Sequence, residues 1–193
     1  MSSLINLVVV SGSPYRPSRT DVLLNALSSE LEQALPVHTR VVSLVDIATD
    51  IGSVLSREHL PAHAEEALRT IEQADVLLVG APVFRGSVPG LFKHLFDLIG
   101  IDALAGKPVL LAATGGSQRH ALVLEHQFRP LLGFFQVLLL PTGVYATQDD
   151  FAGYEISDSA LKSRIELVID QALPVLKGLF PTVGQRAAEV LAA

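Results

Sequence analysis

The sequence predicts an α/β fold, in which a parallel sheet carries helices on both faces. Two observations lead to this prediction. Short apolar runs that end in Gly, Pro, Ser or Thr alternate along the chain with amphipathic stretches long enough for helices. Most of these runs are continuously apolar, without the alternation of a half-exposed strand, which is typical of strands covered on both faces.

Five of the runs are predicted strands. They lie at residues 4–10, 38–44, 75–81, 108–114 and 137–144. The run at 38–44 is weaker and alternates, which predicts an edge strand. Strands separated by helices form βαβ units and pair in parallel. Five such strands predict the order 2-1-3-4-5 of the flavodoxin-like fold.

Five helical stretches follow or separate these strands. The first begins near Ser18 and is predicted over residues 18–35, with its apolar side chains on one stripe. The others are expected at 64–74, 88–99, 118–135 and 158–180. No repeat, low-complexity segment or Pro/Gly/Ser-rich linker divides the chain. Residues 1–193 are therefore predicted to form one domain, with 181–193 as a peripheral or frayed tail.

Composition excludes several classes of function. The formal net charge of −6, without a basic tract, argues against nucleic acid or an anionic membrane as the main partner. The absence of cysteine excludes a disulfide framework, a thiolate nucleophile and a Cys-ligated metal. No signal-peptide pattern or membrane-length apolar stretch is present. We therefore expect a soluble cytoplasmic protein without a metal site.

The loop after the first strand, "SGSPYRPSRT" (11–20), predicts an anion site. It carries Arg16 and Arg19 together with the hydroxyls of Ser13, Ser18 and Thr20, and it contains no carboxylate. The free N–H groups and dipole of the following helix add positive potential at the same place. A phosphate monoester is the expected guest. The alternative is a plain serine cap with solvated arginines.

The next loop, "APVFRGSVPG" (81–90), is stiffened by prolines and turned by glycines. It places Phe84 where solvent would be expected, and its backbone suits the edge of a flat polar ring. The alternative is an ordinary loop with Phe84 in the core.

A third loop, "ATGGSQRH" (113–120), contains Gly115 and Gly116, which allow a ligand to approach the backbone closely. Here the alternative is a tight turn between strand and helix. Because ligands bind beyond the carboxyl ends of parallel strands, the three loops together predict a site for flavin mononucleotide (FMN).

The motifs "SGSPxxPSRT", "APVFRGSVPGLFKHLFDL" and "ATGGS", in this order, resemble those of the flavodoxin-like NAD(P)H-dependent FMN reductases. The likeness covers residues 4–180. It is strongest to the reductase components of two-component alkanesulfonate and methanesulfonate monooxygenases. Relatives commonly place an arginine directly after "GSP", where this chain has Tyr15 and then Arg16.

The resemblance also implies roles for individual residues. The FMN phosphate would be held by Ser13, Ser18, Arg19 and Thr20, with Arg16 as a further candidate. The isoalloxazine ring would face Pro82, Val83, Phe84 and Arg85, and its other edge would face Thr114, Gly115 and Gly116.

As function, the resemblance implies hydride transfer from NADH or NADPH to FMN, with no catalytic acid, base or nucleophile on the protein. The methanesulfonate-type likeness favours NADH. Reduced FMN would pass to a flavin-dependent monooxygenase, and the reductase would be a homodimer or homotetramer. Three alternatives remain: a quinone or azo reductase with tightly bound FMN, a non-catalytic electron carrier, and a phosphate-ester-binding domain without flavin.

The segment "LVLEHQFRPLLGFF" (122–135) predicts an irregular helix, because Pro130 cannot donate a backbone hydrogen bond. Alkanesulfonate-type relatives carry an inserted aromatic residue here, in a π-bulge at a subunit interface. This chain has His126 in its place. The resemblance therefore implies that His126 affects flavin release or contacts a neighbouring subunit. The alternative is a surface histidine beside a proline kink.

Overall fold

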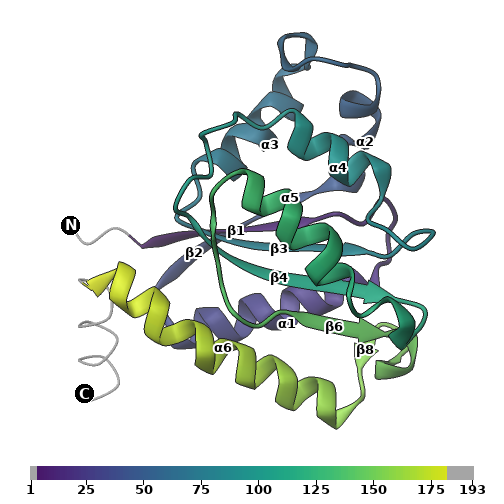
Figure 1. Cartoon of the computed structure of the whole chain (residues 1–193), viewed down its shortest axis with the longest axis vertical. Helices are drawn as coiled ribbons and strands as arrows, with labels where there is room; N and C mark the ends of the chain where they lie inside the picture. The colour runs from purple at the N-terminus through teal and green to yellow at the C-terminus, as the bar shows by residue number, and fades with distance from the viewer. Residues whose placement is uncertain (1–3, 182–193) are drawn as a thin grey trace.

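The computed structural model of the chain describes residues 4–181 and has the predicted layers, with one sheet between two groups of helices (Figure 1). The sheet order is β2-β1-β3-β4-β5, and β6 also pairs with β4. All these pairings are parallel. The four long strands are β1 (Ile5–Ser11), β2 (Val37–Ser43), β3 (Val76–Pro82) and β4 (Pro108–Gly115). The flavodoxin-like fold is confirmed, and β2 lies at the edge as expected.

Buried side chains of the strands divide into two cores. In β1, Val8 and Val10 face one core, while Leu7 and Val9 face the other. The first core is covered by α2 (Leu44–Gly52), α3 (Ala62–Glu72), α4 (Gly90–Asp97) and α5 (Arg129–Phe134). The second is covered by α1 (Arg19–Ala34) and α6 (Ser159–Leu179). This two-sided burial explains why the strand sequences are continuously apolar.

The structure differs from the prediction in the fifth strand. The run expected at 137–144 forms two short strands, β5 (Leu138–Leu139) and β6 (Val144–Thr147), which pair with successive halves of β4. Pro141 lies between them and has no N–H to donate to a neighbouring strand. Its carbonyl instead accepts a hydrogen bond of 2.7 Å from the Arg129 guanidinium. The proline therefore ends one strand, and pairing resumes three residues later.

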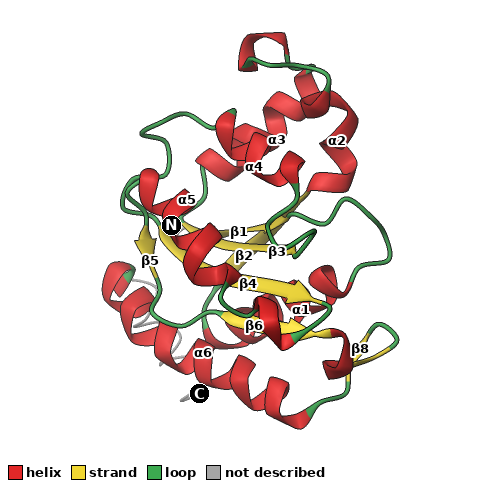
Figure 2. Cartoon of the chain, turned by 45° about the vertical axis from the view of Figure 1, so that its right-hand side comes forward, coloured by secondary structure: helices red, strands yellow, loops and turns green. Residues whose placement is uncertain are grey.

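Several short elements were not predicted from the sequence. They are α2, the 3₁₀ turns Arg57–His59, Gln118–His120 and Gln148–Asp150, and the antiparallel hairpin of β7 (Phe151–Ala152) and β8 (Glu155–Ile156). The helix expected at 118–135 consists of a 3₁₀ turn, a π-helix (Leu124–Phe128) and α5. Figure 2 shows β8 beyond the end of β6, at the carboxyl edge of the sheet.

Within residues 4–181, no helix is long and apolar enough to cross a membrane. Residues 182–193 of the expected tail lie outside the described part of the chain.

Candidate functional site

The three predicted loops meet around one hollow at the carboxyl edge of the sheet. Every predicted binding residue lines it except Arg16 and Arg85. The lining residues among those predicted are Ser13, Ser18, Arg19, Thr20, Pro82, Val83, Phe84, Thr114, Gly115 and Gly116. Most of the predicted residues therefore lie around one hollow, and the structure shows which side chains line it.

The start of α1 forms one wall of the hollow. Ser18 caps this helix, and its Oγ accepts a hydrogen bond of 3.3 Å from the Asp21 N–H. Its own O–H remains a donor for a ligand. Thr20 is buried, and its Oγ1 lies 2.6 Å from Thr114 Oγ1. This contact joins the first loop to the end of β4, so the helix N-terminus and the third loop keep a fixed spacing.

The first loop also packs tightly against β3. The Gly12 N–H donates to the Gly80 carbonyl over 2.7 Å. A Cβ on Gly12 would lie 2.4 Å from Phe92 and 2.6 Å from Ala81, so only glycine fits at this approach. Ser13, the next residue, is buried, and its hydroxyl donates to the Tyr15 carbonyl.

Arg19 is held at the hollow by the β7–β8 hairpin. Its Nε donates to the Gly153 carbonyl over 3.1 Å, and its guanidinium carbon lies 5.5 Å from the centre of the Tyr154 ring. Gly153 adopts a φ of +66°, which aims its carbonyl in a tight turn. Arg19 is the one charged residue that lines the hollow in the described part of the chain. The hollow thus presents one oriented cation at a helix N-terminus and no carboxylate.

Arg16 lies elsewhere. Its two terminal nitrogens donate to the two carboxylate oxygens of Asp46 in α2, over 2.6 and 2.8 Å. The hydrogen bond and charge of Asp46 raise the pKa of Arg16 further above its ordinary value. The carboxylate that the loop itself lacks is therefore supplied by a helix 30 residues away in the chain. The structure does not bring Arg16 together with the other predicted phosphate-binding residues.

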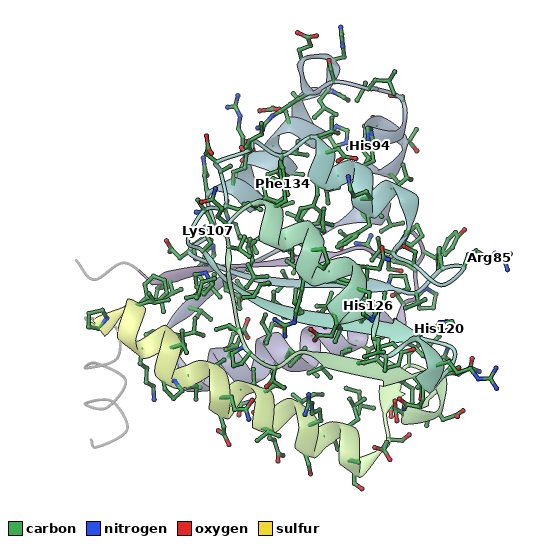
Figure 3. All side chains as sticks on the ribbon, in the orientation of Figure 1. Arg85, His94, Lys107, His120, His126 and Phe134 are labelled. Atoms are coloured by element: carbon green, nitrogen blue, oxygen red, sulfur yellow. The ribbon has the colours of Figure 1, made fainter. Side chains whose placement is uncertain are left out.

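The second loop contains a two-residue turn beside the hollow. Phe84 and Ser87 exchange backbone hydrogen bonds of 2.8 and 3.1 Å, and the residues between them, Arg85 and Gly86, have φ values of +54° and +83°. Positive φ at both central residues is the pattern of a type I′ turn, which usually carries Asn-Gly or Gly-Gly. Figure 3 shows Arg85 pointing away from the body of the molecule.

Phe84 is 38% exposed, and its ring centre lies 6.1 Å from that of Tyr15 across the rim of the hollow. Phe84 does not belong to the core, so the alternative of an ordinary loop with Phe84 in the core is wrong. The Val83 N–H donates to the Thr114 carbonyl over 2.7 Å, so the second and third loops are also joined.

The third loop brings backbone close to the hollow. A Cβ on Gly115 would lie 2.2 Å from the hydroxyl of Tyr145, which donates to the Ser117 carbonyl over 2.6 Å. Burial raises the pKa of Tyr145, so this hydroxyl stays protonated as a donor. A Cβ on Gly116 would meet no heavy atom within 4 Å. A side chain at position 115 would therefore require Tyr145 to move, whereas Gly116 leaves open space beside the backbone.

Sequence reasoning missed several residues of the hollow. Thr147, Gln148 and Tyr154 also line it, from the end of β6 and the segment that follows it. Strands of two residues carry too little periodicity to be recognised, and only the Gly-Tyr pair at 153–154 marks a turn.

His126 lies on the exposed side of the π-helix (Figure 3). The wide turn is closed by the Arg129 N–H, which donates to the Leu124 carbonyl five residues earlier. Pro130, the next residue, cannot continue the hydrogen-bond ladder. The structure thus has an irregular helix at the expected place, and the roles suggested for His126 stay predictions.

Within residues 4–181, no group of three or more His, Cys, Asp or Glu side chains could hold a metal ion.

Comparison with known proteins identifies the family. Residues 5–152 match the family described as NADPH-dependent FMN reductase. The chain belongs to this family. It is an oxidoreductase that uses FMN and a reduced nicotinamide nucleotide, and the resemblance seen in the loop motifs is confirmed.

Two bacterial relatives cover nearly the whole chain. An NADH-dependent FMN reductase, SfnF, of Pseudomonas fluorescens is 57% identical over 91% of this chain and 94% of its own. An FMN reductase (NADPH) of Pseudomonas aeruginosa is 55% identical over 92% of this chain and 96% of its own. Among solved structures, the apo form of the NADH:FMN oxidoreductase EmoB is 28% identical, with a TM-score of 0.77 over 86% of this chain and 87% of that one.

The hollow fits FMN by the chemistry of its donors. A phosphate monoester carries close to two negative charges, and the start of α1 offers Arg19, hydroxyl donors and helix N–H groups to such an anion. The apolar rim residue Phe84 and the open backbone beside Gly116 suit a flat ring with polar edges.

Proposed function

We propose that this hollow is the FMN site, with the flavin phosphate at the start of α1 and the isoalloxazine between the second and third loops. The observation that carries the proposal is Arg19, an oriented cation at the N-terminus of α1 and, within residues 4–181, the one charged residue that lines the hollow. The Thr20–Thr114 contact supports the same placement, because it fixes the distance between the phosphate end and the ring end.

Bound FMN supplies the ring that accepts a hydride from the reduced nicotinamide. The residues of this chain supply geometry. Ser18 and Arg19 orient the phosphate, and the linked second and third loops hold the ring with one face open to a nicotinamide. The lining contains no His, Asp, Glu or Lys within the described residues, so no side chain of that kind is positioned there to move a proton.

We further propose that FMN behaves as a substrate that leaves after reduction and reaches a partner sulfonate monooxygenase. An open rim supports this, because Tyr15 and Phe84 are exposed at the entrance. NADH is the proposed donor, on the methanesulfonate-type likeness of the motifs and the NADH-dependent relative from Pseudomonas fluorescens.

A homodimer or homotetramer is proposed as well. Leu122 and Phe134 are 61% and 64% exposed, at the two ends of the segment that contains the π-helix and α5. Contact with a second copy of the chain would cover such exposed apolar side chains. Sedimentation analysis would test this state directly, and a monomer at micromolar concentration would contradict it.

The function is tested by oxidation of NADH and NADPH at 340 nm with flavin-stripped protein and increasing free FMN. We expect turnover that saturates at FMN concentrations far above that of the enzyme, and a higher kcat/KM with NADH. A protein that stays yellow after purification and reduces quinones or azo dyes without added FMN would favour the tightly bound alternative. FMN binding without nucleotide oxidation would favour an electron carrier.

A further inference from the structure

The π-helix is joined to the second loop by one side-chain hydrogen bond. Ser87 Oγ donates to Gln127 Oε1 over 3.0 Å, between residues 40 apart in the chain. It is the one side-chain hydrogen bond made by residues 83–87 in the described part of the chain. Ser87 is the closing residue of the Phe84–Ser87 turn, so the bond acts on the turn that borders the hollow.

Packing holds Gln127 in a fixed place relative to this turn. The next residue, Phe128, is fully buried, and its ring centre lies 5.4 Å from that of Phe92 in α4. Helix α4 begins at Gly90, directly after the second loop. The packing of Phe128 on Phe92 therefore fixes the position of the π-helix relative to the end of the second loop. The Gln127 amide, next to Phe128 in the chain, thus contacts the loop from a well-packed helix.

The turn needs such support because its backbone is strained. Arg85 occupies left-handed backbone with a φ of +54°, a region that disfavours side chains other than Asn, Asp or Gly. Strained conformations at binding sites persist where surrounding contacts hold them. The Ser87–Gln127 bond adds a side-chain hydrogen bond to the two backbone bonds of the turn and to the contact of Phe84 with Tyr15.

We propose that Gln127 is a positioning residue for flavin: through Ser87 it holds the Phe84–Ser87 turn where the isoalloxazine binds. This gives the π-helix a role inside its own subunit, in addition to the role suggested for His126. The proposal rests on the proposed placement of FMN in the hollow.

The test is a double-mutant cycle with Gln127→Ala, Ser87→Ala and the double variant. FMN affinity is measured by quenching of flavin fluorescence, and KM and kcat are measured for FMN and NADH. Loss of a neutral hydrogen bond predicts an increase of about threefold to tenfold in the Kd and KM for FMN. The KM for NADH stays within twofold. The double variant is no weaker than the weaker single variant, because both substitutions remove the same bond.

Two further variants separate positioning from general stability. Gln127→Glu keeps an oxygen acceptor for Ser87 and is expected to bind FMN within about twofold of the wild type. Glu125→Ala, in the same π-helix, removes an exposed carboxylate that pairs with Arg129 and leaves FMN affinity unchanged. If Gln127→Ala does not fold, Ser87→Ala and Gln127→Glu still decide the question.

The outcomes distinguish this inference from the proposed site. If Arg19→Ala weakens FMN binding while Gln127→Ala and Ser87→Ala do not, the site stands and the positioning role is refuted. Additive effects of the two alanine substitutions also refute it. If Arg19→Ala leaves FMN binding unchanged, the placement of FMN in the hollow fails first.

Discussion

Arg19 and Arg16 lie three residues apart in the chain, and the structure predicts a large effect on FMN binding when Arg19 is replaced by alanine and a small one when Arg16 is replaced. Arg19 lines the hollow and is oriented by Gly153 and Tyr154. Arg16 is engaged by Asp46 and does not line the hollow. The pair therefore offers a matched comparison, in which the same charge is removed at two nearby positions of the chain.

The expected magnitude follows from the contact that is lost. A hydrogen bond to a charged group contributes about 1.5–3 kcal/mol, and each 1.4 kcal/mol changes a dissociation constant tenfold. Arg19→Ala should therefore raise the Kd for FMN roughly 10-fold to 100-fold. The lower part of this range is expected, because Arg19 is partly exposed and water weakens its interaction with phosphate.

Arg16→Ala should raise the same Kd less than about fivefold. Its ion pair with Asp46 has both side chains more than half exposed, at 54% and 55%, and such pairs contribute at most about 1 kcal/mol. The assay is titration of flavin-stripped protein with FMN, followed by fluorescence. The reasoning is refuted if both variants weaken FMN binding equally, or if Arg16→Ala has the larger effect.

Three other predictions concern stability. Gly115→Ala places a Cβ 2.2 Å from the Tyr145 hydroxyl and should lower the free energy of unfolding by about 1–3 kcal/mol. Gly116→Ala has open space at its Cβ and should change that free energy by less than about 0.5 kcal/mol. Urea denaturation of both variants measures the difference. Asparagine adopts the left-handed backbone at φ +54° more readily than arginine, so Arg85→Asn should raise the melting temperature by a few degrees in calorimetry. A lower melting temperature would show that the backbone of Arg85 is not strained. The bonds from Arg57 lower the pKa of Glu65 to about 2, so this carboxylate stabilises the fold above pH 4.5 and loses that effect as the pH falls towards 2. Glu65→Gln should flatten this part of the stability profile, and an unchanged profile would show that the ion pair contributes nothing.

The sequence determined the architecture because its signals are local and repeated. Short apolar runs such as residues 4–10 and 108–114 are typical of strands buried on both faces, and the helices between them favour parallel pairing. Parallel strands bring their carboxyl ends to one edge, so three loops distant in the chain were expected to meet there. The glycines at 115–116 and the hydroxyl-rich segment before α1 then marked the hollow.

The tertiary structure decided how each side chain is used. No local sequence feature shows which of Arg16 and Arg19 lines the hollow. Asp46, in a helix that was not predicted, binds Arg16, and the β7–β8 hairpin, whose strands have two residues each, holds Arg19. These ion pairs and side-chain hydrogen bonds join residues far apart in the chain, so they leave no periodic pattern in the sequence from which they could be predicted. The Ser87–Gln127 bond is of the same kind, because it forms only when the core has brought α4 and the π-helix together.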